Sequence, residues 1–242
     1  MSYPVETYER LAGEAREIIA RYPEGHARSA LLPMLHLVQS EDGYVSANGI
    51  ALCAELLGIT RAEVSAVATF YTQYKRHPTG EYLVGVCTNA LCAVMGGDEI
   101  WEAVSEKVGV GTDETNEAGT ITLERLECNA ACDYAPVVMV NWEFFDNQTP
   151  ESACALIDDI EAGKPLHPTR GSAVLPTFKE TEHVLAGFLD GHEACRQDEH
   201  VCIVVGTREA RRLVVPAERC ADALVLIERH ADAVARAAEA DA

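Results

Sequence analysis

The stretch Glu81-Tyr-Leu-Val-Gly-Val-Cys87-Thr-Asn-Ala-Leu-Cys92 places a pair of thiols at the end of a predicted strand. A second pair, Cys128-Asn-Ala-Ala-Cys132, follows another predicted strand. The two pairs are too far apart in the sequence to share one loop, so two loops must meet in space. Four thiolates that converge from two short loops are typical of a metal centre.

The spacing within each pair favours an iron–sulfur cluster over a zinc ion. Structural zinc sites usually use C-x2-C knuckles, because both thiolates bind one ion at about 2.3 Å. A [2Fe–2S] cluster is larger and takes two thiolates at each iron, and plant-type ferredoxins contain a C-x4-C step. The pairs here have four and three intervening residues. Zinc and unmetallated thiols remain the alternatives at this point.

The residues around the thiols support a cluster. Those between the thiols are small or polar, so that backbone N–H groups can approach the sulfurs: Thr88, Asn89 and Ala90, then Asn129, Ala130 and Ala131. Gly96-Gly97 permits a tight turn after the first pair. Asp133 follows Cys132 directly, and a carboxylate there disfavours an added electron. We therefore expect a low reduction potential.

Composition limits the function classes. The chain has 242 residues, enough for one large or two modest domains, and a net charge of −20. That charge repels nucleic acid and anionic membrane surfaces. We expect no signal peptide and no membrane insertion, since no apolar run approaches ~20 residues. A cytoplasmic location is expected, where nine cysteines indicate metal ligation rather than disulfides.

The order of predicted elements indicates an α+β fold. Four helices are expected first, over residues 5–22, 26–39, 47–57 and 61–70, with Ser46 and Thr60 as N-caps. Strands at 81–86, 121–128, 136–140 and 142–145 and helices at 98–108 and 150–163 follow. The order β-α-β-β-α matches a reduced thioredoxin-like sandwich with the cluster at one end of the sheet, and Ala135-Pro136 is a candidate cis bond.

The remainder of the chain is less regular. Pro165, Pro168, Gly171 and Pro176 predict a linker, followed by a helix at 178–188, strands at 201–205 and 212–215, and a helix at 217–239. The predicted domains are a helical bundle for partner docking (1–78), a thioredoxin-like [2Fe–2S] domain (79–166) and a C-terminal extension of unknown role (167–242).

Other cysteines, histidines and glycines give weaker signals. Cys53 and Cys154 lie in apolar helices and are predicted to be buried rather than ligands, and Cys220 is predicted to be inert. His192, Cys195, His200 and Cys202 could form a second zinc site, although an exposed loop is the simpler interpretation. Gly109-Val-Gly111 follows a helix and lacks a third glycine, so we expect no nucleotide site for NADH or FMN on this chain.

Taken together, these motifs resemble the 24-kDa-type [2Fe–2S] subunit of bacterial respiratory NADH:quinone oxidoreductase, complex I. The resemblance covers about residues 10–190 and rests on three motifs: Val67-Ala-Thr-Phe-Tyr-Thr-Gln-Tyr, Gly85-Val-Cys87-Thr-Asn-Ala-Leu-Cys92, and Leu126-Glu-Cys128-Asn-Ala-Ala-Cys132-Asp-Tyr-Ala-Pro136. It implies a helical bundle followed by a thioredoxin-like domain, and a [2Fe–2S] cluster on Cys87, Cys92, Cys128 and Cys132.

The resemblance also implies a setting. The chain would dock on the flavoprotein subunit that carries FMN and NADH, beside the iron–sulfur subunit of the peripheral arm, on the cytoplasmic side of the membrane. Phe70, Tyr71 and Tyr74 are candidates for the docking surface, or else core residues. The diaphorase parts of NAD-reducing hydrogenases and NAD-dependent formate dehydrogenases, and a free thioredoxin-like ferredoxin, remain alternatives.

Overall fold

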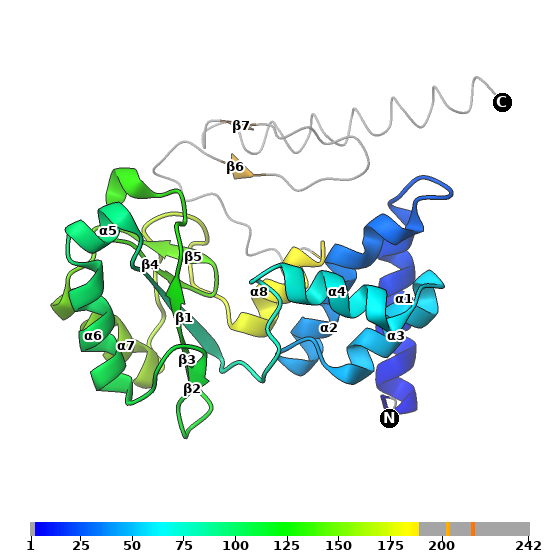
Figure 1. Ribbon diagram of the computed structural model, residues 1–242, viewed down its shortest axis with the longest axis horizontal. Coiled ribbons are helices and arrows are strands. Elements are labelled where there is room, and N and C mark those ends of the chain that lie inside the picture. Colours follow the sequence, from blue (N-terminus) through cyan, green and yellow to red (C-terminus); the bar gives the residue numbers. More distant parts are fainter. Residues whose placement is uncertain (1–2, 189–201, 204–213, 216–242) are drawn as a thin grey trace.

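The computed structural model describes residues 3–188, 202–203 and 214–215, which form a helical lobe and a sheet lobe side by side (Figure 1). The helical lobe contains α1 (Val5–Ala20), the 3-10 helix η1 (Ala27–Ala30), α2 (Leu31–Asp42), α3 (Ala47–Leu57) and α4 (Arg61–Phe70). The four predicted helices are confirmed, with differences of a few residues at the ends of the first two.

Local capping explains where α3 begins and ends and where α4 begins. The Ser46 side chain accepts a hydrogen bond from the Gly49 amide at the start of α3. Thr60 and Glu63 form a reciprocal capping box at the start of α4. Gly58 ends α3 in the left-handed conformation, where glycine has no steric penalty.

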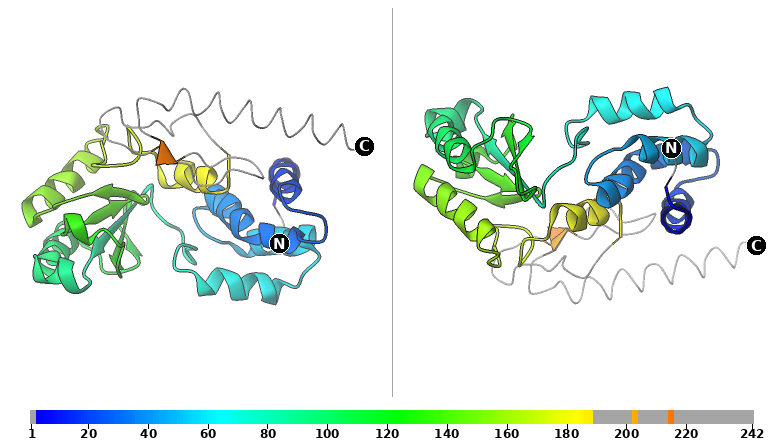
Figure 2. Two further views of the ribbon diagram at one scale, coloured as in Figure 1. Left: turned by 90° about the horizontal axis from the view of Figure 1, so that it is seen from above. Right: turned by 90° about the horizontal axis from the view of Figure 1, so that it is seen from below.

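The sheet lobe is built on five strands in the order β2-β3-β1-β4-β5. The strands are β1 (Tyr82–Cys87), β2 (Glu114–Thr115), β3 (Ile121–Leu126), β4 (Val138–Val140) and β5 (Glu143–Phe145). β1 and β3 are parallel, and the other pairs are antiparallel. Helices α6 (Gly97–Val108) and α7 (Pro150–Glu161) both cover the face that points away from the helical lobe (Figure 2). This is the predicted thioredoxin-like arrangement.

The structure differs from the sequence prediction at several boundaries. A short helix, α5 (Ala90–Val94), and the two-residue strand β2 were not predicted, because neither is long enough to show a period. β3 ends at Leu126 rather than Cys128, and β4 begins at Val138 rather than Pro136. The candidate cis bond, Ala135-Pro136, is cis. The second thiol loop therefore lies wholly outside the sheet.

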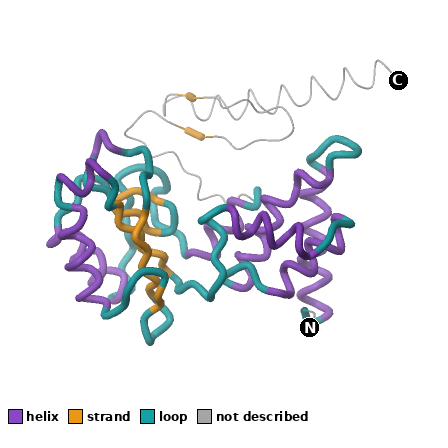
Figure 3. Tube along the Cα trace, in the orientation of Figure 1, coloured by secondary structure: helices purple, strands orange, loops and turns teal. Residues whose placement is uncertain are grey.

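The segment after α7 runs from the sheet lobe to the helical lobe (Figure 3), and it is not a free linker, because its residues are buried in both cores. Leu166 and Leu175 are buried in the core of the sheet lobe, and Arg170 forms a bridge with Phe144 of β5. Helix α8 (Phe178–Leu185) then packs on α2, and Ala186 is buried in the core of the helical lobe. The segment between about 165 and 186 thus connects the two lobes by packing.

Beyond residue 188 only two strands are described. β6 (Cys202–Ile203) pairs antiparallel with β7 (Val214–Val215), within the two predicted strand regions. The helix predicted at 217–239 lies outside the described residues. Within the described residues, no helix has the length and apolar character needed to cross a membrane.

Candidate iron–sulfur site

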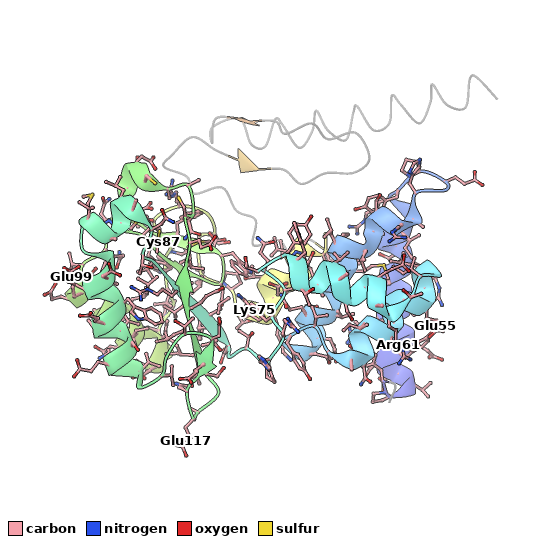
Figure 4. All side chains as sticks on the ribbon, in the orientation of Figure 1. Glu55, Arg61, Lys75, Cys87, Glu99 and Glu117 are labelled. Carbon is pink, nitrogen blue, oxygen red and sulfur yellow. The ribbon has the colours of Figure 1, made fainter. Side chains whose placement is uncertain are left out.

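Parallel pairing of β1 and β3 brings the two thiol loops to the same edge of the sheet. The register pairs Cys87, the last residue of β1, with Leu126, the last residue of β3. The Cys87 thiol also donates to the backbone oxygen of Glu127 at 3.3 Å, directly before Cys128. Figure 4 shows Cys87 at this end of the sheet. The two loops therefore meet, as the sequence predicted.

The first thiol pair is buried. Cys87 and Cys92 are each 3% exposed and form an apolar cluster with Ala135. Cys92 lies in α5, which begins where the Asn89 side chain accepts a hydrogen bond from the Ala90 amide. The pKa of Cys92 is raised to about 11. Burial is the larger cause, and the hydrogen bond with the Cys87 thiol is the second. The pair is held in a water-poor environment.

The second thiol pair is exposed and lies in an irregular loop. The sulfurs of Cys128 and Cys132 are 3.9 Å apart, and their contact raises the pKa of Cys132. Ala130, between them, adopts a φ of +53°, and its amide donates to the Cys128 sulfur at 3.3 Å. The small residue at this position allows the close approach that the sequence suggested.

The two pairs interact with each other electrostatically. The charge of Cys132 raises the pKa of Cys92, and the charge of Cys87 raises that of Cys132. Four neighbouring thiolates repel one another unless a cationic centre offsets their charge, so the donor set suits an iron core. The thiols are arranged as two pairs. In the described part of the chain, no group of three or more His, Cys, Asp or Glu side chains is arranged to hold a metal ion.

Arg125 is a feature of the site that the sequence did not reveal. Its Nε donates to Thr88 Oγ1 in the first thiol loop at 3.1 Å, it pairs with Asp98 at the start of α6, and it lies over the ring of Trp101. Arg125 thereby ties the first loop to α6. A lone arginine near the end of a strand carries no sequence signal for this role.

The remaining candidates lie away from the site or outside the described residues. Cys53 is 1% exposed in the core of the helical lobe, as predicted, whereas Cys154 is only half-buried in α7. His192, Cys195, His200 and Cys220 lie outside the described residues, and Cys202 is described only as part of β6. The suggested second zinc site therefore stays a hypothesis.

Comparison with known proteins agrees with the fold. Residues 15–161 match the model of a family described as thioredoxin-like [2Fe-2S] ferredoxin. The chain belongs to this ferredoxin family. Membership favours an iron–sulfur cluster over zinc as the cofactor.

Relatives of this ferredoxin-family chain are subunits of an oxidoreductase complex. It is 62% identical over 189 residues to the E subunit of NADH-quinone oxidoreductase from Mycobacterium tuberculosis, covering 78% of this chain and 74% of that protein. It is 36% identical over 151 residues to NADH-quinone oxidoreductase subunit 2 of Thermus thermophilus, covering 62% of this chain and 83% of that protein. The chain is thus a homologue of these complex I subunits, which confirms the resemblance.

Solved structures of a hydrogenase share the fold at lower sequence similarity. A chain of a NAD+-reducing [NiFe]-hydrogenase superposes with a TM-score of 0.51 and 19% identity, covering 56% of this chain and 23% of that chain. At this identity the likeness concerns the fold alone.

Proposed function

We propose that this chain is the electron-transfer subunit of an NADH:quinone oxidoreductase. It would hold one [2Fe–2S] cluster on Cys87, Cys92, Cys128 and Cys132 and exchange electrons with FMN on a partner flavoprotein subunit. The observation that carries this proposal is the meeting of two thiol pairs at one sheet edge. The 62% identity to a mycobacterial NADH-quinone oxidoreductase subunit supports the assignment to this kind of complex.

The residues of the chain have distinct roles in this proposal. When bound, a [2Fe–2S] cluster supplies one-electron chemistry. Cys87 and Cys92, which are buried, and Cys128 and Cys132, which are exposed, would hold it, so that an electron-transfer partner could reach the second pair. The Ala130 amide would stabilise negative charge on the Cys128 sulfur. The chain itself would bind neither FMN nor NADH.

The domains can be assigned on the same basis. Residues 1–78 would serve docking, residues 79–166 would hold the cluster, and residues 167–242 would form an extension. The start of that extension braces the two lobes through α8. The chain would lie in the peripheral arm, beside the flavoprotein and iron–sulfur subunits, on the cytoplasmic side of the membrane.

Phe70 and Tyr71 support a docking surface on the helical lobe. Phe70, at the end of α4, is 77% exposed, and its ring packs edge-on against that of Tyr71 with centroids 4.9 Å apart. Exposed aromatic pairs are common at protein interfaces. Tyr74 does not belong to this surface, because it is buried and donates to the backbone oxygen of Leu32.

Two other assemblies remain candidates: a NAD-reducing hydrogenase and a NAD-dependent formate dehydrogenase, each with a corresponding diaphorase subunit. The fold shared with a hydrogenase chain is consistent with the first. A free thioredoxin-like ferredoxin is a third candidate, although it would need no helical lobe. The identity to NADH-quinone oxidoreductase subunits favours complex I.

Purification of the tagged chain from its native cells tests the proposal. We expect a flavoprotein subunit to co-purify, and NADH to reduce the cluster in that assembly but not in the isolated chain. Phe70→Ala should weaken the association, whereas Val5→Ala, an equally exposed apolar site on α1, should not. A nickel–iron or molybdenum subunit in the preparation would favour the alternatives, and a chain without any partner would favour the free carrier.

A further inference from the structure

Two buried side-chain nitrogens lack a hydrogen-bond partner among the described residues: Asn129 Nδ2 and Arg170 Nε. The Arg170 guanidinium is otherwise engaged, since it pairs with Asp146 at 2.9 Å and lies over the Phe144 ring at 4.4 Å. Asn129 is the one in the candidate site, because it directly follows Cys128 in the second thiol loop. A buried donor without an acceptor is costly and uncommon in native proteins.

Other asparagines in the sheet lobe have structural roles that Asn129 lacks. Asn89, in the first thiol loop, caps α5 by accepting from the Ala90 amide at 2.8 Å. Asn141 is fully buried, and its Nδ2 donates to the backbone oxygens of Glu81 and Pro176. The buried amide of Asn129 therefore has a role other than capping a helix or hydrogen-bonding to the backbone near a strand.

We propose that the side-chain amide of Asn129 donates a hydrogen bond to a sulfur of the [2Fe–2S] cluster and so raises its reduction potential. The inference rests on the proposed ligation by four cysteines. Thiolate and sulfide sulfurs accept such bonds, and the negative charge on them increases on reduction, so a donor stabilises the reduced form more than the oxidised form. The neighbouring Ala130 amide already points at the Cys128 sulfur. The donor opposes the effect of the nearby Asp133 carboxylate.

Redox titration of three variants, monitored by EPR, tests the proposal. Asn129→Leu removes the donor at similar size, and we expect the equilibrium constant for reduction to fall about fivefold, as for one lost hydrogen bond. At 59 mV per tenfold for one electron, that lowers the midpoint by about 40 mV. Asn129→Asp removes a donor and adds a charge. Asn89→Asp adds a charge in the first loop while keeping its capping oxygen, so Asn129→Asp should lower the midpoint further than Asn89→Asp.

A second measurement does not depend on how the Asn129 variants fold. The Asn89→Asp protein, grown with asparagine labelled with 15N in the side chain, should show a 15N coupling to the reduced cluster in pulsed EPR. Absence of that coupling, or an Asn129→Leu midpoint equal to that of the wild type, overturns the inference while leaving the cluster site intact. A wild-type protein without two irons and two sulfides per chain defeats the proposed site and the inference together.

Discussion

A Cβ atom placed on Gly97 would lie 2.6 Å from the backbone oxygen of Cys87 and 2.9 Å from the carbonyl group of Cys92. Gly97 is the first residue of α6, so the start of this helix packs directly on the backbone of both thiols of the first pair. Real Cβ atoms do not come this close to backbone atoms. Glycine at this position is therefore required by packing against the proposed ligands, rather than by turn geometry.

Gly97→Ala should displace the first thiol loop. Because the contacts are to backbone atoms, the Cys87 and Cys92 sulfurs must move, and we expect iron content to fall well below that of the wild type. Gly13→Ala is the matched control, because nothing lies within 4 Å of the position in α1. That control should keep its full iron content and gain up to about 1 kcal/mol of stability from better helix propensity. Equal iron content in the two variants would contradict the packing explanation.

Substitution of single cysteines should separate ligands from bystanders. Cys128→Ser is expected to lose the visible absorption and the reduced-state EPR signal, since serine is a poor ligand for iron here, while the helical lobe stays folded. Cys154→Ser, in α7, should keep both signals. Far-ultraviolet circular dichroism checks the fold of each variant. An unchanged EPR signal in Cys128→Ser would count against the proposed ligand set.

The parts of the structure that local sequence determines were predictable. The caps at Ser46 and Thr60 and the C-terminal Gly58 depend on neighbours within four residues, and they placed both ends of α3 and the start of α4 correctly. The thiol pairs were predictable for a similar reason: both follow recognisable strands, and parallel strands end at a common edge.

The contacts between distant segments were not predictable. The proline- and glycine-rich composition after α7 indicated a linker, yet Leu166 and Leu175 are buried in a core and α8 packs on α2. The close approach of Gly97 to Cys87 and the contact of Arg125 with Thr88 likewise depend on how remote segments fold together. Periodicity and capping patterns depend on nearby residues, so they do not predict contacts between distant segments.

The two lobes are connected by a buried carboxylate, which leads to a prediction on stability. Glu182 of α8 is fully buried, accepts from Trp142 Nε1 at 2.9 Å, and contacts His36 Nδ1 of α2 at 2.6 Å. Trp142→Phe removes one donor from this carboxylate, which should cost about 1–3 kcal/mol. We expect the thermal midpoint to fall by about 2–4 °C for each kcal/mol lost.

Trp101→Phe provides a matched control for that prediction. Trp101 is the other tryptophan of the chain. It is partly buried against the core of the sheet lobe, and the Arg125 guanidinium lies 5.7 Å from its ring. Trp101→Phe should lower the thermal midpoint less than Trp142→Phe does. Equal shifts in the two variants would show that the hydrogen bond to Glu182 adds nothing to the connection between the lobes.

Cys53 should make the stability of the chain depend on alkaline pH. Burial raises the pKa of its thiol to about 12, whereas an unfolded cysteine titrates near 8.5. The folded state thus holds the proton more tightly, so this contribution is fully present below about pH 8.5 and is lost as pH rises toward 12. Above pH 9, the free energy of unfolding should fall by up to about 1.4 kcal/mol per pH unit from this group.

Anaerobic chemical denaturation of Cys53→Ala and Cys53→Ser tests this prediction. In both variants the free energy of unfolding should fall less steeply with pH, by that amount, because all other thiols are shared with the wild type. Parallel curves for wild type and both variants between pH 8 and 10 would contradict the prediction.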